Sequence, residues 1–413
     1  MKLQARNLLR RIGFYLTIFG PGLITASADN DAPGIATYSM AGSTYGYSFL
    51  WLIVLVTVGE VIIQEIAARM GAVTGKGTAD LIREQFGVRI TAFAMLCLLL
   101  ANFGTTVAQF AGVAAGMELL GVSRYIAVPL AMLGVGYVVL RGSYKWVEKV
   151  LLVLCLSALS YVISAFVVRP SWGDVLRSAL IPTVKSDPNY ILTALATIGT
   201  TITPWAFVYM QASVADKGMR MESYHYTRID VISGAVWGNV VSAFIIICTA
   251  ATLYVHGIQV ESAERAALAL EPLVGQWARY LFSSGLLGAS LLAASVLPLS
   301  TTYAVCEAFG WERGLDHRSH EAPIFYGLYG GILIVSALVV LTPGIPLFPM
   351  MWLSQSLNAI LLPVLLILVL KIANSRRVMG ERTNSQTQNF FAWGLTILIG
   401  VAMLALFISP FLC

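Results

Sequence analysis

Long apolar segments separated by short polar connections fill almost the whole chain. Eleven such segments can be delimited, and most are long enough to cross a bilayer core as a helix, which takes about 20 residues. The pattern therefore predicts an all-α membrane protein with eleven transmembrane helices and no separate soluble domain. The predicted boundaries are 12–41, 48–68, 90–119, 125–140, 147–168, 189–215, 229–255, 274–306, 323–343, 349–370 and 390–411.

The distribution of Lys and Arg predicts how these helices are oriented. Cytoplasmic loops carry an excess of positive residues, and an N-terminus inside the cell places most of the 26 Lys and Arg there. The basic residues 1–11 are not followed by a small-residue cleavage site, so we expect the first segment to be retained. We predict a multi-pass cell-membrane protein with a cytoplasmic N-terminus and an extracellular C-terminus. The few basic residues left outside are Arg124, Arg169, Arg177, Lys185, Arg265 and Arg279.

Composition excludes several classes of function. The 413 residues are 58% hydrophobic and only 11% charged, whereas soluble domains carry about 25% charged residues. This argues against a soluble enzyme and against a nucleic-acid-binding protein. The five cysteines lie in or beside apolar segments and predict neither disulfides nor a zinc site. Because no His, Cys or Ser/Lys group falls at membrane depth, we expect no enzyme activity and no cofactor; a monomer in the lipid bilayer is expected.

Two of the eleven segments are interrupted halfway. Residues 29–34 (Asp-Asn-Asp-Ala-Pro-Gly) break the first, and residues 200–205 (Thr-Thr-Ile-Thr-Pro-Trp) break the sixth. Non-helical backbone at membrane depth occurs where protein or a wet cavity satisfies it. Breaks five helices apart are typical of two inverted repeats with a substrate between them; the alternative is two simple proline kinks. We predict one transport domain, 1–413, with repeats 12–168 and 189–371 and an extra helix 390–411.

Acidic side chains at membrane depth indicate the charge of the substrate. Asp29 and Asp31 lie at the first break and Glu60 lies within the second span, while no Lys or Arg lies near the middle of a span. Buried acids without buried bases favour a cation as the transported species. Asp31 is the strongest ligand candidate; it could also cap the following half-helix, and capping is compatible with ligation. Asp29 and Glu60 either line an ion pathway or contact another helix; both readings stay open.

At these positions the sequence resembles the Nramp family of divalent-metal transporters. The resemblance covers residues 14–382 in the family's order and spacing. It implies a LeuT-like fold with broken helices 1 and 6, alternating access, and proton-coupled uptake of manganese or iron. The motifs that carry it are Gly20-Pro21-Gly22, Val73-Thr74-Gly75-Lys76-Gly77, Val147-Glu148-Lys149-Val150, Thr203-Pro204-Trp205, Leu353-Ser354-Gln355 and Arg376-Arg377-Val378-Met379-Gly380.

The departures from the family concentrate on the site that the resemblance implies. The family's Asp-Pro-Gly-Asn reads Asp-Ala-Pro-Gly here, so Gly34 stands where the family has a ligating Asn. Thr203 replaces a Met that supplies a thioether ligand, and Trp205 replaces a His. Neutral residues also stand where the family has its proton route. Met210 or Gln211 replaces a histidine of the sixth helix, and about Thr106 and Gln109 replace two acids of the third helix.

These replacements predict a harder substrate than the family's usual one. A thioether favours softer transition metals, and a roomier oxygen-lined site suits Mg²⁺, which keeps several waters when bound. The pattern resembles the Nramp-related magnesium transporters. We predict uncoupled import of partly hydrated Mg²⁺, with Mn²⁺ also admitted. The expected metal contacts are Asp31, Thr203, the carbonyls of Ala28 and Thr200, the space left by Gly34 and, by resemblance, Gln355.

Three alternatives stay open at this stage. The first is a proton-coupled Mn²⁺/Fe²⁺ importer of the usual family kind. The second is a sodium-coupled amino-acid transporter on the same fold, which would call for a Gly-rich first break rather than one that holds an acid. The third is a site for a trivalent ion such as aluminium, which the single retained ligand acid disfavours.

Overall fold

The computed structural model describes residues 30–140, 159–219, 221, 224–312 and 320–408. The predicted first half-helix, with Ala28 and Asp29, lies outside these residues, as does the start of the fifth segment. Within them, eight apolar stretches of helix are long enough to cross a membrane, and two shorter apolar helices accompany them, Arg124–Val139 and Leu159–Val168. All regular secondary structure in the described part of the chain is helical, as the hydrophobic pattern predicts.

The helices follow the predicted segments closely. The first five described helices are α3 (Ala32–Tyr45), α4 (Leu50–Thr74), α5 (Thr78–Leu119), α6 (Arg124–Leu140) and α8 (Leu159–Val168). The sixth segment forms α10 (Pro188–Thr201) and α11 (Pro204–Asp216), and the later ones form α12 (Tyr224–Thr252), α15 (Ala278–Phe309), α16 (Pro323–Leu341), α17 (Leu347–Ala373) and α19 (Gln386–Ile408). Short elements between them are η1 (Gly46–Phe49), α9 (Trp172–Leu180), η3 (Tyr254–His256), α13 (Ala263–Ala267), η4 (Leu268–Leu270), α14 (Glu271–Val274), η5 (Gly275–Trp277) and α18 (Arg376–Met379).

One predicted boundary is wrong in an informative way. The third segment was expected to begin at residue 90, whereas α5 begins at Thr78 and contains a non-helical residue, Gly87, with φ 79° and ψ 172°. This conformation is open to glycine because it has no Cβ. A short amphipathic helix of about two and a half turns, residues 78–86, therefore precedes the apolar part. It contains charged residues, so it does not stand out as an apolar segment in the sequence.

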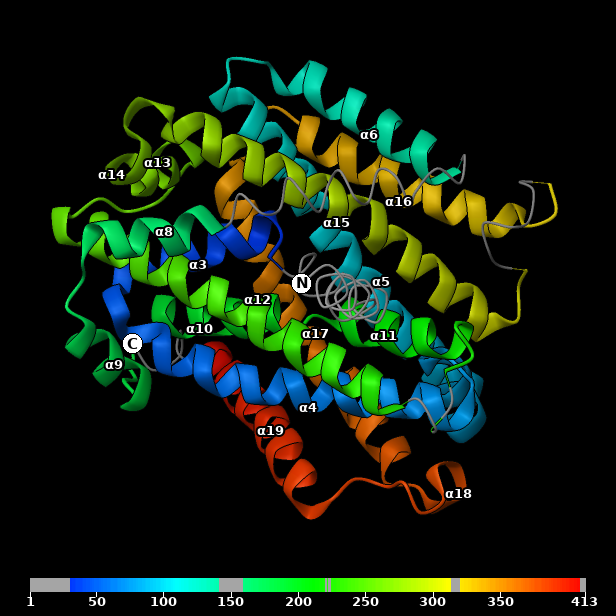
Figure 1. Cartoon of the computed structure of the whole chain (residues 1–413). Coiled ribbons are helices and arrows are strands. Elements are labelled where there is room, and N and C mark those ends of the chain that lie inside the picture. The colour runs from blue at the N-terminus through cyan, green and yellow to red at the C-terminus, as the bar shows by residue number, and fades with distance from the viewer. Residues whose placement is uncertain (1–29, 141–158, 220, 222–223, 313–319, 409–413) are drawn as a thin grey trace, which may run out of the picture.

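Helix α3 lies at the centre of the bundle. It is 14 residues long, which at 1.5 Å per residue is about 21 Å, too short to cross the bilayer core alone. In Figure 1, α6 and α16 lie on one flank and α19 on the opposite flank, with α3, α10, α12 and α17 between them. Helix α3 contacts α12, α17, α10 and α5, so its first residue is enclosed by protein on several sides.

Close backbone contact draws these central helices together. A Cβ added to Gly42 of α3 would lie 2.6 Å from the Ile246 carbonyl of α12, and one at Gly199 of α10 would lie 2.0 Å from the Gln355 carbonyl of α17. Without a hydrophobic driving force in lipid, helices associate through such close packing at small residues. The two half-helices at the breaks are held by this packing.

Candidate functional site at the two helix breaks

Asp31 lies at the first break, directly before α3. Its backbone is extended (φ −80°, ψ 179°), and its side chain caps the helix by accepting a 2.8 Å hydrogen bond from the Gly34 N–H. Pro33 lies in the first turn, where a missing N–H costs nothing. The capping role considered for Asp31 is therefore confirmed, and the side chain is only 2% exposed. Capping occupies one lone pair of one carboxylate oxygen, which leaves others for a metal ion.

A second side chain reaches Asp31 from α5. The Gln109 amide donates from Nε2 to the other carboxylate oxygen at 2.5 Å, and Gln109 is fully buried. Its amide oxygen has no hydrogen-bond partner among the described residues. Buried polar atoms without a partner are rare and costly. The first break therefore combines a carboxylate with an unpartnered amide oxygen beside it.

The sixth segment breaks between α10 and α11. Ile202 (φ −114°, ψ 78°) and the extended Thr203 (φ −81°, ψ 136°) separate the two half-helices. Because Pro204 has no N–H, the carbonyl four residues earlier, that of Thr200, has no helical donor. The Thr200 hydroxyl is also buried without a partner among the described residues. Oxygen atoms of the Thr200 side chain and backbone are thus available at this break.

Two contacts connect this break to its neighbours. The Tyr38 hydroxyl of α3 lies 2.9 Å from the Thr201 hydroxyl at the end of α10. On the other side, Gly199 packs against the backbone of Gln355, whose amide oxygen accepts from Asn358 at 2.9 Å. The structure therefore brings Gln355, Thr200 and α3 into one region. The Gln355 side chain itself forms hydrogen bonds with Ser354 and Asn358 of its own helix.

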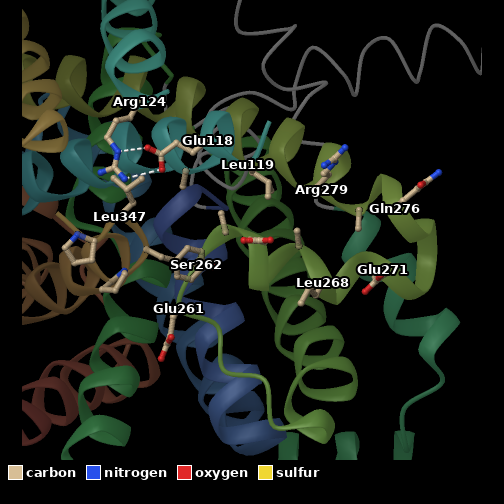
Figure 2. A pocket seen from close by; sticks show the side chains of 18 of the residues that line it. Glu118, Leu119, Arg124, Glu261, Ser262, Leu268, Glu271, Gln276, Arg279 and Leu347 are labelled. Carbon is tan, nitrogen blue, oxygen red and sulfur yellow. Dashed lines mark hydrogen bonds and ion pairs between the residues drawn. The ribbon is translucent and has the colours of Figure 1, made fainter. Parts of the chain in front are cut away.

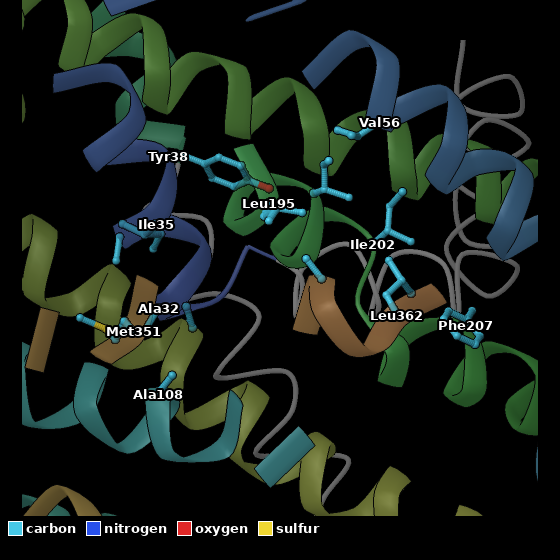
Figure 3. Packing of buried hydrophobic residues seen from close by; sticks show 14 of the residues in the cluster. Ala32, Ile35, Tyr38, Val56, Ala108, Leu195, Ile202, Phe207, Met351 and Leu362 are labelled. Carbon is cyan, nitrogen blue, oxygen red and sulfur yellow. The ribbon is translucent and has the colours of Figure 1, made fainter. Parts of the chain in front are cut away.

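Figure 3 shows the packing around the start of α3, where Ala32 lies near Met351 of α17 and Ala108 of α5. A Cβ added to Gly112 of α5 would lie 2.3 Å from the Ala32 Cβ and 3.6 Å from the Met351 sulfur. A thioether therefore lies beside the first break, although none is present at residue 203. The sequence analysis did not identify Met351, because its position depends on how α17 packs on α5.

A large cavity opens near this point at one end of the bundle. It has a volume of about 920 Å³ and lies among α5, α13, α15 and the start of α17. Ala115 and Phe348 line it; each lies about one helical turn from Gly112 and Met351, respectively. Because residues 118–124, 261–279 and 345–349 surround it, the predicted topology places this vestibule on the extracellular side.

Carboxylates outnumber basic side chains around the vestibule. Figure 2 shows Glu118 clamped by Arg124 through two hydrogen bonds, of 2.5 and 3.1 Å. The other acids that line it are Glu261, Glu264 and Glu271, and the other base is Arg279. A cleft lined mainly by one sign of charge raises the local concentration of the opposite ion. This vestibule favours cations.

Two positions that the sequence comparison aligns with the family's proton route, Trp205 and Gln211 (the latter with Met210 as the alternative), are buried in the described structure. Trp205 is fully buried against Leu292, Ala293, Val296 and Leu297 of α15, and its indole N–H has no partner among the described residues. Gln211 is also fully buried; its amide oxygen accepts from the Thr78 hydroxyl at 2.8 Å and its nitrogen donates to the Lys76 carbonyl at 3.0 Å. Gln211 therefore ties α11 to the start of α5.

The two acids of α4 lie in different surroundings. Glu65 pairs with Arg69 at 3.2 Å, as its spacing predicts, and accepts a hydrogen bond from Tyr224. Glu60 is 3% exposed and accepts from Gln64 at 2.7 Å and from Asn239 of α12 at 2.5 Å. The sequence analysis did not identify Asn239. Its polar side chain inside the long apolar segment 229–255 could have indicated a contact with a buried polar group. The described residues contain no group of three His, Cys, Asp or Glu side chains that could hold a metal.

Comparisons with known proteins agree with this architecture. The profile of the family described as "Natural resistance-associated macrophage protein-like" (Nramp) matches residues 22–409. Among curated proteins, the chain is 24% identical to the divalent metal cation transporter MntH of Bacillus subtilis, over 96% of this chain and 93% of that protein. It is 29% identical to MntH of Erwinia tasmaniensis, over 92% and 91% of the two chains.

Solved structures share the fold. A manganese transporter of Eremococcus coleocola superposes with a TM-score of 0.78 at 20% identity, covering 94% of this chain and 85% of that one. MhsT, solved in complex with L-phenylalanine, gives a TM-score of 0.61 at 15% identity, covering 94% and 98%. These likenesses confirm the predicted LeuT-like fold. Since the family profile covers nearly the whole sequence, this chain belongs to the Nramp family of multi-pass membrane transporters.

Proposed function

We propose that this protein imports divalent metal, mainly Mg²⁺ and also Mn²⁺, by alternating access and without proton coupling. The observation that carries the proposal is the Asp31 carboxylate, buried at the first break and held between the Gly34 N–H and the Gln109 amide. Relatives named divalent metal cation transporters support the class of substrate. The choice among divalent ions rests on the chemistry of the neighbouring atoms.

Those atoms are mostly hard oxygen donors. Around Asp31 we assign contacts to the Gln109 amide oxygen, the Thr203 hydroxyl and the Thr200 carbonyl; the Ala28 carbonyl, expected from the sequence, lies outside the described residues. Magnesium prefers oxygen ligands and is usually bound through one or two carboxylates while it keeps several waters. Gly34 adds no side chain and leaves room for such water. The Gln355 amide of α17 is a further contact that forms when the helices rearrange.

The vestibule supplies the approach to this site. Its acidic lining attracts cations, and two of its lining residues, Ala115 and Phe348, lie about one helical turn from Gly112 and Met351, which pack near Ala32 at the start of α3. A hydrated ion would collect there and reach Asp31 once α17 and α3 separate. We propose that Asp29, which lies outside the described residues, belongs to the same ion pathway.

Among the described residues, the positions compared with the family's proton route carry no titratable side chain, which supports uncoupled transport. A symported proton needs a titratable group linked to the metal site. Trp205 cannot titrate, and both polar atoms of the Gln211 amide are engaged by residues 76–78. On α5 the corresponding positions are the amide of Gln109 and the hydroxyl of Thr106, which donates to its own helix at 2.7 Å.

One observation favours a second candidate, the proton-coupled Mn²⁺ importer typical of the family. The Met351 sulfur lies beside Ala32, and thioethers select softer transition metals over Mg²⁺. If Met351 ligates the ion, Met351→Leu lowers Mn²⁺ affinity and leaves Mg²⁺ unchanged. If it only packs against α5, both affinities change together or not at all.

The decisive experiment is metal uptake into proteoliposomes. Wild-type protein should accumulate Mg²⁺, and Mn²⁺ in competition with it, with no metal-dependent acidification of the lumen. Asp31→Ala should reduce uptake to the level of protein-free liposomes. The matched control is Asp187→Ala, because Asp187 also caps a proline-started helix, α10, by accepting from the Asn189 N–H. Near wild-type uptake by folded Asp31→Ala would refute the assignment.

A further inference from the structure

Helix α9 presents a row of apolar side chains on its outer side. Trp172, Leu176 and Leu180 follow one another at a spacing of four residues, which places them on one side of the helix. They are 42%, 62% and 70% exposed, and we call them the α9 stripe. The polar Asp174 and Arg177 of the same helix are exposed as well. An exposed apolar patch rimmed by polar residues is typical of a contact with a membrane or with another protein.

The inner side of α9 rests on the helix bundle. Val175 is buried, and the helix contacts α4 and η1. The segment that follows α9 is held in place too, because the Trp51 indole N–H of α4 donates to the Thr183 carbonyl at 3.1 Å. In Figure 1, α9 lies at the margin of the bundle. The fold therefore fixes the direction in which the α9 stripe faces.

The α9 stripe continues an apolar surface of α8. That helix belongs to a predicted membrane span, and its Ile163, Phe166 and Val167 are exposed. The centroid of the Phe166 ring lies 5.1 Å from that of Trp172 and 5.7 Å from that of Phe244 on α12. Tryptophan is enriched where a membrane span meets water. One apolar surface therefore runs from the end of a membrane span, through these rings, onto α9.

Basic side chains flank the α9 stripe. Arg169 precedes the helix and Arg177 lies within it, and both are exposed, while Asp174 is the one acidic residue of α9. A guanidinium group binds phosphate through paired N–H donors. A helix with an apolar side and basic residues toward its polar side lies in the plane of a membrane interface. Hydrophobicity and charge thus both match a phospholipid surface.

We propose that α9 lies in the headgroup layer of the bilayer, with the α9 stripe among the acyl chains and Arg169 and Arg177 on lipid phosphates. By the predicted topology this is the outer leaflet. Because α9 packs on α4 and η1, the lipid contact anchors the outer ends of these elements at the membrane surface. The proposal does not depend on which metal binds at Asp31.

The test measures tryptophan fluorescence of the full chain in phosphatidylcholine vesicles whose acyl chains carry bromine, which quenches indoles that it contacts. The chain has nine tryptophans, so the Trp172 signal is the difference between wild type and Trp172→Phe. We expect bromine to quench this signal strongly and aqueous iodide to quench it little. The matched control is the difference between wild type and Trp205→Phe, because Trp205 is fully buried and bromine should leave its signal nearly unchanged.

A second comparison tests the two arginines. Bromine is placed on a minor fraction of phosphatidylglycerol in phosphatidylcholine, or on the same fraction of phosphatidylcholine. Stronger quenching of Trp172 by the anionic lipid is expected in wild type, since each arginine at the surface enriches anionic lipid about fivefold. Arg169→Gln with Arg177→Gln should abolish this excess and keep the quenching by phosphatidylcholine. The control, Arg265→Gln with Arg279→Gln, removes the same charge from another segment and should keep the excess.

Three results would overturn the proposal. Quenching of the Trp172 signal by iodide but not by bromine would place the α9 stripe in water. Quenching by neither would show that protein covers it, such as a second copy of this chain. An excess for phosphatidylglycerol that survives Arg169→Gln with Arg177→Gln would refute the phosphate contacts. If Trp172→Phe fails to fold, Leu176→Trp adds a reporter to the same stripe, and its added emission should be quenched by bromine in the same way.

Discussion

At the scale of single residues, an amide lies at the first break although Gly34 supplies none. The position after Pro33 is a glycine and offers no side chain, but the Gln109 amide from α5 lies against Asp31 instead. Its oxygen lies beside the carboxylate and has no partner among the described residues. In the proposed function the Gln109 oxygen serves as a hard ligand that comes from a continuous helix and not from the broken one.

Loss of the Gln109 amide should weaken metal binding. In Gln109→Leu the carboxylate loses a donor and the metal loses an oxygen, and a hydrogen bond to a charged group contributes about 1.5–3 kcal/mol. We expect Mg²⁺ affinity to fall by about ten- to a hundredfold in isothermal titration. Thr106→Val is the control, because the Thr106 hydroxyl bonds its own helix. Equal losses in both variants would contradict the role of Gln109.

Restoring the family's ligands should change metal preference. In the double variant Thr203→Met with Gly34→Asn, a thioether returns and the space for water shrinks, so Mn²⁺ should gain over Mg²⁺ in competitive uptake. Each single variant should have a smaller effect, because ligand type and cavity volume act together. An unchanged Mg²⁺:Mn²⁺ ratio in a transporting double variant would show that these two positions do not set selectivity.

The residue scale also shows where sequence reasoning ends. The cap at Asp31 is predictable, since Asp followed by Pro and Gly within three residues is local chemistry. The contact with Gln109 spans 78 positions, and the approach of Met351 depends on how α17 packs on α5. Nothing in the spacing of either residue fixes its partner. Polar residues at helical spacing inside α5, such as Asn102, Thr106 and Gln109, only indicate that this face meets something polar.

At the scale of elements, one glycine governs how closely three helices approach. Gly112 of α5 lies where a Cβ would come within 2.3 Å of Ala32 and 2.5 Å of the Ser290 hydroxyl of α15. The lengths of the apolar segments predicted these helices and their order, because a long apolar segment identifies a membrane span. It could not predict the crossing points, since those depend on which small residues allow backbones to meet.

A methyl group at Gly112 should displace the start of α3. Gly112→Ala would cost about 1–3 kcal/mol through overpacking and move Asp31, the residue before Ala32, out of place. We expect a lower melting temperature and reduced uptake, with partial recovery in Gly112→Ala combined with Ala32→Gly. Gly134→Ala on α6 is the control, because no atom lies within 4 Å of its added Cβ. A fully active Gly112→Ala protein would show that this crossing tolerates separation.

At the scale of the whole molecule, the two ends of the helix bundle differ: the vestibule lies at one end, and side-chain contacts join the helices at the other. Four carboxylates and two guanidinium groups surround the wide end, while the opposite end of the bundle is tied by Gln211 and by Arg69, which donates to the Arg382 carbonyl at 2.6 Å and to Asn384 at 2.8 Å. The structure is therefore more open toward the vestibule. In the proposed function, combined with the predicted orientation, cations outside the cell approach the site from this end.

Membrane potential alone should drive accumulation. A divalent ion gains about 4.6 kcal/mol at 100 mV, which corresponds to roughly 2,000-fold accumulation. We expect Mg²⁺ uptake into proteoliposomes to increase with an imposed inside-negative potential. The internal pH, reported by a pH-sensitive dye, should stay constant. Acidification that scales with metal flux would contradict uncoupled transport. Collapsing the potential with an ionophore should stop net accumulation and leave exchange of labelled metal intact.

The buried indole of Trp205 gives the protein an optical signal of its own. An indole in apolar surroundings without a hydrogen bond emits at shorter wavelength than one in water, and Trp205 is fully buried with no partner for its N–H among the described residues. It follows Thr203 by two positions, at the start of α11. Any transport step that rotates α11 away from α15 would expose this ring to water and shift its emission to longer wavelength. Turnover could therefore be followed by intrinsic tryptophan fluorescence, as the difference between the spectra of wild type and Trp205→Phe.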